Sequence, residues 1–105
     1  MKIYKISGGL DLQGWSRSVE AIEVEQKPKT YVTTRGRYGN SRYEKKDFMA
    51  ILSNYGSRHN YYSFYTYCLE GQQQEALDMI KKHIIDKATI IISEAKKIET
   101  YLTNL

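Results

Sequence analysis

Residues that commonly build enzyme active sites and metal centres are scarce in this sequence. It has one cysteine, Cys68, and two histidines, His59 and His83, which are too few for a structural zinc site of Cys and His ligands. We expect Cys68 to be a buried thiol and not an activated nucleophile, because it shares a predicted strand face with Phe64. The sequence therefore favours a non-enzymatic protein with no catalytic residues, no cofactor and no metal.

Long apolar runs and paired cysteines are also missing. A lone cysteine excludes an internal disulfide and favours a reducing compartment. No apolar run approaches the roughly 18 residues of a membrane span, and the first residues lack the apolar core of a signal peptide. We therefore expect a cytoplasmic protein without a membrane partner.

Residues 72–104 contain neither glycine nor proline, and their apolar positions recur at helical spacing. From Leu77 onward the intervals are 7, 4, 3, 4, 3, 4 and 3 residues, the a/d pattern of a coiled-coil seam. A helix of this length extends for roughly 50 Å, whereas a compact chain of this size is only about 33 Å across. We therefore expect a homo-oligomer, a dimer or larger, assembled through the second half of the helix. The expected oligomerisation residues are Ile84, Ala88, Ile91, Ala95, Ile98 and Leu102.

The rest of the chain shows the period-two alternation of half-buried strands. Ile22 and Val24 fall on one face of such a segment, and Glu23 and Glu25 fall on the other. We predict an α+β fold, a small antiparallel β-sheet of about four strands followed by one long C-terminal helix. A single domain covers residues 1–105, with a β-rich, basic and aromatic part at 1–70 and the helix at 71–105. The predicted segments are strands at 1–7, 18–26, 30–34 and 60–70, a short strand at 41–43, a turn at Gly8-Gly9 and two helical turns at 45–52.

Cationic and aromatic residues gather in the first two thirds of the chain. Residues 27–46 carry seven cations against one acid, a net charge of +6, whereas the helical segment is neutral. Arginine forks suit phosphate, and tyrosine rings can stack on a planar base. This combination predicts a site for a small anionic nucleotide-type ligand. The expected ligand-binding residues are Trp15, Arg35, Arg37, Tyr38, Arg42, Tyr43, Arg58, Tyr61, Tyr65 and Tyr67.

The aromatic residues also have a purely structural interpretation. Tyrosine is a good strand former, and cross-strand aromatic pairs stabilise a sheet by about 0.2 to 1 kcal/mol each. The single tryptophan, Trp15, lies in a segment predicted as a loop, where it is either a plug at the edge of the core or a stacking platform. The tyrosines therefore have two interpretations, as core residues and as a binding surface.

Three segments carry a family resemblance. They are IEVEQKPKTY at residues 22–31, KKD at 45–47 and EALDMIKK at 75–82. In this pattern the chain resembles small accessory proteins of phages and prophages in low-GC Gram-positive bacteria. The resemblance implies a compact, non-enzymatic, often oligomeric protein of the bacterial host cytoplasm that binds host machinery stoichiometrically, as counter-defence proteins do.

Three functions follow as expectations. The first is a sponge, an oligomer that sequesters a nucleotide-derived immune signalling molecule in a pocket of Tyr and Arg side chains. The second is a stoichiometric inhibitor of a host defence nuclease or another host enzyme, since interface hot spots favour aromatic and Arg side chains. The third is a small nucleic-acid-binding protein that uses the basic segment at residues 27–46. We favour the sponge, because arginines and tyrosines share one part of the chain and the neutral helix is left for assembly.

Overall fold

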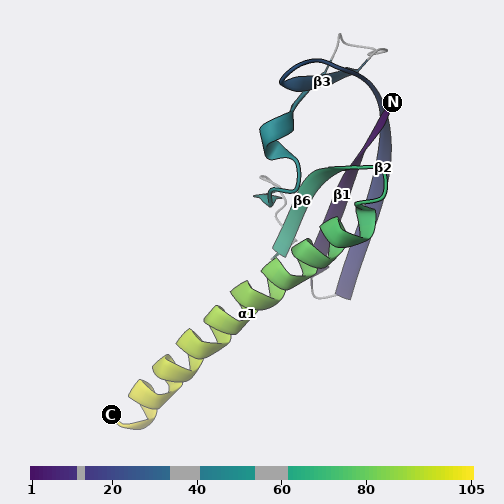
Figure 1. Cartoon of the computed structure of the whole chain (residues 1–105). Helices are drawn as coiled ribbons and strands as arrows, with labels where there is room; N and C mark the ends of the chain where they lie inside the picture. The colour runs from purple at the N-terminus through teal and green to yellow at the C-terminus, as the bar shows by residue number, and fades with distance from the viewer. Residues whose placement is uncertain (12–13, 34–40, 54–61) are drawn as a thin grey trace.

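The computed structural model describes residues 1–11, 14–33, 41–53 and 62–105. They form a curled antiparallel sheet and one long helix that leaves the sheet at an angle (Figure 1). The predicted α+β class is confirmed, but the sheet has six strands, in the order β4-β3-β2-β1-β6-β5, and not about four. The elements are β1 (Lys2–Asp11), β2 (Gly14–Gln26), β3 (Thr30–Thr33), β4 (Arg42–Glu44), the 3-10 turn η1 (Lys45–Asp47), β5 (Leu52–Ser53), β6 (Tyr62–Leu69) and α1 (Gln73–Thr103).

The first hairpin is longer than the sequence predicts. β1 and β2 pair from Lys2 opposite Glu23 to Asp11 opposite Gly14, so the predicted turn at Gly8-Gly9 is wrong and both glycines lie inside a strand. A Cβ atom on Gly8 would lie 2.6 Å from Cη2 of Trp15. The glycine is therefore required by close approach of a ring from the neighbouring strand, and not by a turn.

The alternation of β6 is as predicted. Phe64, Thr66 and Cys68 are buried, and the residues between them are partly exposed. The buried face of β6 lies under α1, whose side chains Ala76, Leu77, Ile80 and Ile84 complete a core cluster with Ile6 of β1. Cys68 is fully buried, as the sequence suggests.

The predicted helix at residues 45–52 is wrong. Only η1 is helical, and at Phe48 the backbone returns to an extended conformation with φ −71° and ψ 133°. Phe48 forms a parallel bridge with Tyr67, and its ring lies 5.0 Å from the ring of Tyr31. Packing of Phe48 against the rings of Tyr31 and Tyr67 holds this segment against the sheet. The helical spacing of the apolar residues in 45–52 therefore does not reflect a helix.

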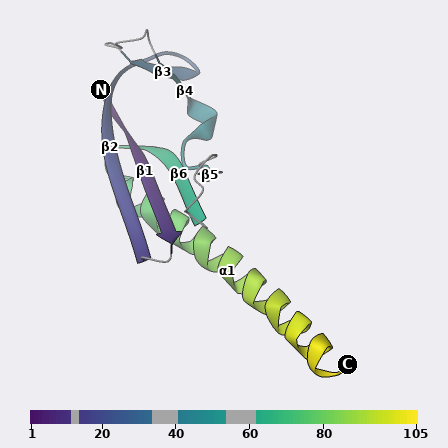
Figure 2. The same ribbon diagram turned by 180° about the vertical axis from the view of Figure 1, so that it is seen from behind.

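A second core cluster lies on the side of the sheet away from α1, which we call the open face. It contains Ile3, Val24 and Tyr31, with Ile22, Tyr43, Phe48 and Leu69 packed against them. In Figures 1 and 2 strand β3 and the turn η1 lie over one end of the sheet. Among the described residues, no helix covers the rest of the open face.

The helix α1 is unbroken over its whole length, and only its first part packs on the sheet. Its buried residues end at Ile84, and every residue from Thr89 onward is exposed. The radius of gyration is 17.8 Å and the long axis measures 62 Å, well above the radius of about 13 Å for a compact chain of this length. The distal part of α1 therefore projects from the globular part (Figure 2). No helix in the described part of the chain has the length and apolarity to cross a membrane.

Candidate functional site

Three adjacent strands bring the candidate site together on the open face. In the pairing register, Ser7 of β1 lies between Ser18 of β2 and Tyr65 of β6. One step along, Lys5 lies between Glu20 and Tyr67. Because side chains directly opposite in an antiparallel sheet share a face, these two rows form one continuous surface next to the second core cluster.

Aromatic rings form the wall of this surface. The ring centroids of Tyr43 and Tyr67 are 5.1 Å apart, and those of Tyr65 and Tyr67 are 5.8 Å apart, both in edge-to-face geometry. The ring of Phe48 lies 5.9 Å from that of Tyr67 on another side. Such contacts hold the rings in fixed orientations, so the wall is formed before any ligand arrives.

Electrostatics at the wall favour a neutral phenol beside a cation. Burial, with smaller contributions from the neighbouring phenols of Tyr65 and Tyr43, raises the pKa of Tyr67 to about 12. The ammonium of Lys5 lies 4.6 Å from the centroid of the Tyr65 ring, where the π-face attracts it. Tyr67 therefore stays protonated at neutral pH. Lys5 supplies a positive charge beside the aromatic wall, and Lys45 supplies another on the same face, 5.0 Å from the centroid of the Tyr31 ring.

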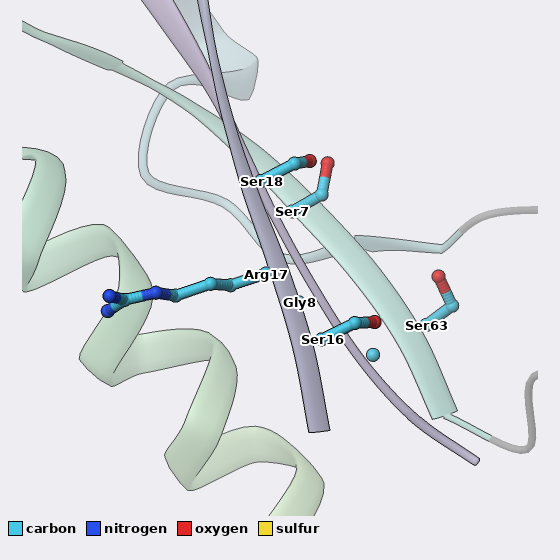
Figure 3. Close-up of a pocket in the computed structure, with 7 residues that line it drawn as sticks. Ser7, Gly8, Ser16, Arg17, Ser18 and Ser63 are labelled. Carbon is cyan, nitrogen blue, oxygen red and sulfur yellow. The ribbon is translucent and has the colours of Figure 1, made fainter. Parts of the chain in front are cut away.

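Small hydroxyl side chains form the floor. Ser7, Ser16, Ser18 and Ser63, here called the serine patch, line a shallow hollow of about 190 Å³ together with glycine backbone. In Figure 3 the four serine side chains point to one side of the sheet, whereas Arg17 points to the other, toward α1. Hydroxyls can donate and accept hydrogen bonds, so the patch suits a ligand with hydroxyl groups or phosphate oxygens.

Apart from Trp15, the predicted ligand-binding residues divide into three groups. Tyr43, Tyr65 and Tyr67 lie together, as described above. Arg42 is exposed and neighbours Tyr43 along β4, so the alternation of the strand directs it to the opposite side. Five of the predicted residues lie outside the described part of the chain, namely Arg35, Arg37, Tyr38, Arg58 and Tyr61.

Trp15 lies on the α1 side of the sheet, opposite to the tyrosines. Its ring covers Gly8, and the ammonium of Lys81 on α1 lies 5.9 Å from the ring. The side chain is 39% exposed. Of the two interpretations left open by the sequence, this position corresponds to a plug at the edge of the helix–sheet core.

Lys5 and the serine patch were missed by the sequence analysis. Serine is common in loops, and the patch residues come from three segments that are up to 56 positions apart in the chain. The one local signal was the alternation of small polar residues along β2 at Ser16 and Ser18. Only the register of β1 with β2 and β6 shows that they meet.

The described residues offer little for catalysis or metal binding. They contain no group of three or more His, Cys, Asp or Glu side chains able to hold a metal ion. Burial raises the pKa of the Cys68 thiol, which opposes formation of a nucleophilic thiolate. His83 lies on α1 and is half-buried, with its ring 4.6 Å from that of Phe64 on the side of the sheet away from the open face.

The predicted oligomerisation residues also separate by position. Ile84 is buried against the sheet and Ala88 is half-buried at the point where the helix leaves it. Beyond that point Ile91, Ile98 and Leu102 are 50%, 61% and 60% exposed, and Ala95 is exposed as well. An apolar stripe thus continues from the core onto the projecting helix.

Known proteins do not assign the chain to a family. Comparison with protein-family models, with curated proteins and with solved structures finds no match. The resemblance to phage and prophage accessory proteins stays a prediction.

Proposed function

We propose that this chain is a non-enzymatic binding protein that sequesters a nucleotide-derived ligand on its open face and self-associates through α1. The observation that carries the proposal is the rigid wall of Tyr43, Tyr65 and Tyr67 beside the serine patch. A planar base suits the aromatic wall, and sugar or phosphate oxygens suit the serine hydroxyls and Lys5. The counter-defence role implied by the resemblance would follow if the ligand is an immune signal.

Binding without turnover is favoured by the surroundings of the serines. The base that most often activates a serine nucleophile is a histidine within hydrogen-bond reach. The one described histidine, His83, lies on the other side of the sheet. The described open face instead offers Glu20 and Lys5 in one row of the sheet, an arrangement suited to orienting a ligand.

A melting screen tests the proposal directly. The chain is heated with mono-, di- and cyclic nucleotides, and a ligand at 100 times its Kd should stabilise it by about 2.7 kcal/mol. Ser18→Leu fills the serine patch and Tyr65→Ala removes part of the wall, so each should abolish the shift. Val19→Thr is the matched control, because Val19 follows Ser18 in β2 but faces the opposite side. Absence of any shift across the panel would refute ligand sequestration.

A second candidate function, stoichiometric binding to a protein, is favoured by the outer edge of β2. The N–H and C=O groups of Val24 both bond to Met1, at 2.9 and 3.2 Å. Alternation then directs the backbone groups of Arg17, Val19, Ala21 and Glu23 away from β1. β3 pairs with β2 only from Val24 to Gln26, so within the described residues this edge has no neighbouring strand and can accept an extended peptide.

Proline substitution separates this candidate from the first. Val19→Pro removes an outward N–H and should leave the β1–β2 ladder intact. It should abolish capture of a host protein while the nucleotide melting shift remains. If a captured partner binds Val19→Pro as tightly as the wild-type chain, recognition through the β2 edge is excluded.

A further inference from the structure

We propose that α1 pairs with α1 of a second copy in antiparallel orientation, with Ile91 of one chain against Leu102 of the other. The segment that pairs is residues 88–105, and its seam is formed by Ala88, Ile91, Ala95, Ile98, Leu102 and Leu105. The inference rests on the self-association in the proposed function and adds its orientation and register.

The seam is continuous with the packed face of the helix. Leu77 and Ile84 belong to the core cluster under the sheet, and the same a/d spacing carries the stripe on to Leu105, which is 84% exposed. Ile85 and Ile92 flank the seam and are 63% and 56% exposed. Apolar surface of this extent on a projecting helix is typical of an association site.

Charge favours a second copy as the partner. From residue 85 onward the helix carries three lysines, Lys87, Lys96 and Lys97, and three acids, Asp86, Glu94 and Glu99. Two such segments do not repel each other through net charge. A strongly charged partner such as nucleic acid gains nothing from a neutral surface.

Side-chain size favours the antiparallel orientation. In heptad terms Ala88, Ala95 and Leu102 occupy a positions, and Ile91, Ile98 and Leu105 occupy d positions. Parallel pairing would stack Ala on Ala in one layer and Ile on Ile in the next, and Ile at d is not the choice of parallel two-stranded coils. Antiparallel pairing sets a against d, so that each alanine meets a large side chain and the layers have more equal volume.

Charges beside the seam also favour the antiparallel orientation. In a parallel pair Glu94 at g would face Glu99 at e of the partner helix, twice in each dimer, and e/g charges set helix orientation. In the antiparallel pair Glu94 lies beside the second copy's Tyr101, and Ile92 lies beside its Glu99. The like-charge contacts are thereby avoided.

The register follows from what the sheet already covers. Sliding the helices by one heptad toward the sheet would require Ile84 in the seam, but Ile84 is only 5% exposed because it packs on the sheet. That register would also place Glu94 of the two chains against each other. Sliding by a heptad in the other direction would leave only residues 95–105 overlapped.

This arrangement has a consequence for ligand binding. Twenty-five helical rises separate Ile84 of one chain from Ile84 of the other, about 38 Å along the rod. The two sheets therefore lie at opposite ends, and each open face is built from one chain. We expect one ligand per chain and independent sites, not a pocket shared between subunits.

Mass and disulfide formation test the proposal together. Light scattering should give twice the chain mass for the wild-type protein and a single chain mass for Ile98→Glu. Ser93→Glu, on the helix face opposite to the seam, should remain dimeric. A monomeric wild-type chain at micromolar concentration would overturn the pairing.

Cysteine variants then determine the orientation. An equal mixture of Ile91→Cys and Leu102→Cys chains should oxidise to a mixed disulfide, and neither variant should cross-link alone, since like positions lie about 16 Å apart in this register. The wild-type chain is the control, because Cys68 is buried. A disulfide dimer of Ile91→Cys alone would establish parallel pairing, and a dimer that forms neither disulfide would exclude the register.

Failure here is distinguishable from failure of the ligand proposal. The monomeric Ile98→Glu chain retains a complete open face, so it should keep the nucleotide melting shift of the wild-type protein. If that shift disappears on dissociation, the site is shared between chains and the antiparallel arrangement is wrong. If no chain shows a shift but the mixed disulfide forms, the pairing stands and ligand sequestration fails.

Discussion

Replacing Gly8 by alanine should destabilise the helix–sheet core by about 1 to 2 kcal/mol. The new Cβ would lie 2.6 Å from Cη2 of Trp15 and 2.8 Å from Cγ2 of Ile80, both closer than van der Waals contact. Overpacking of this kind costs typically 1 to 3 kcal/mol. Loss of glycine freedom in the unfolded chain offsets roughly 0.4 to 1 kcal/mol of that cost.

The two neighbours differ in how they can respond. Ile80 is fully buried, so moving it would disturb the core around it, whereas Trp15 is 39% exposed and can swing outward. We therefore expect most of the adjustment in the indole ring, with loss of its contact to Lys81. Since Trp15 is the only tryptophan, its fluorescence reports this movement without ambiguity.

Urea unfolding followed by fluorescence and by circular dichroism measures the effect. Gly8→Ala should lower the midpoint and shift the emission to longer wavelength, whereas Ser7→Ala, on the same strand but the open face, should do neither. In a Trp15→Ala background the cost of Gly8→Ala should shrink but not vanish, because the contact with Ile80 remains. If Gly8→Ala is as stable as the wild-type chain and its emission is unchanged, close packing of Trp15 on Gly8 is refuted.

Three further predictions concern single polar groups. Thr66 is fully buried and, within the described residues, its Oγ1 has no hydrogen-bond partner, so Thr66→Val should raise stability in urea by about 1 to 2 kcal/mol, whereas Thr66→Ser should not. The pKa of Tyr67 is raised to about 12, so the protonated phenol contributes fully to stability below its unfolded pKa near 10, and that contribution is lost between about pH 10 and 12. Tyr67→Phe should therefore reduce the loss of stability at alkaline pH. An unchanged decrease of stability between about pH 10 and 12 would contradict the raised pKa of Tyr67. The hydrogen bond from Tyr4, and to a smaller extent that from Gln73, lowers the pKa of Glu70. The contribution of the Glu70 carboxylate to stability is therefore present above its unfolded pKa of about 4.3, and it is lost as the pH falls through its pKa in the folded chain. Glu70→Gln should flatten the acid limb slightly in thermal melts, and Glu75→Gln, an exposed acid in the first turn of α1, is its control.

Local periodicity determined much of this protein from the sequence alone. The alternation of β6 and of Ile22 to Glu25 in β2 sorted buried from exposed residues correctly. The lack of glycine and proline after Gly71 predicted one unbroken helix, too long for its own core. These predictions are correct because each depends on residues only one to seven positions apart along the chain.

Tertiary structure decided which faces meet. Gly8 is needed because of a ring on the next strand, and Phe48 leaves a helical path because Tyr31 and Tyr67 bury it. Trp15 and Tyr65 lie on opposite faces of one sheet, although the sequence predicts both as ligand-binding aromatic residues. The serine patch exists only through strand register, since a shift of one residue would reverse the face of every side chain on that strand. Register depends on long-range packing, and that is the information a linear pattern does not contain.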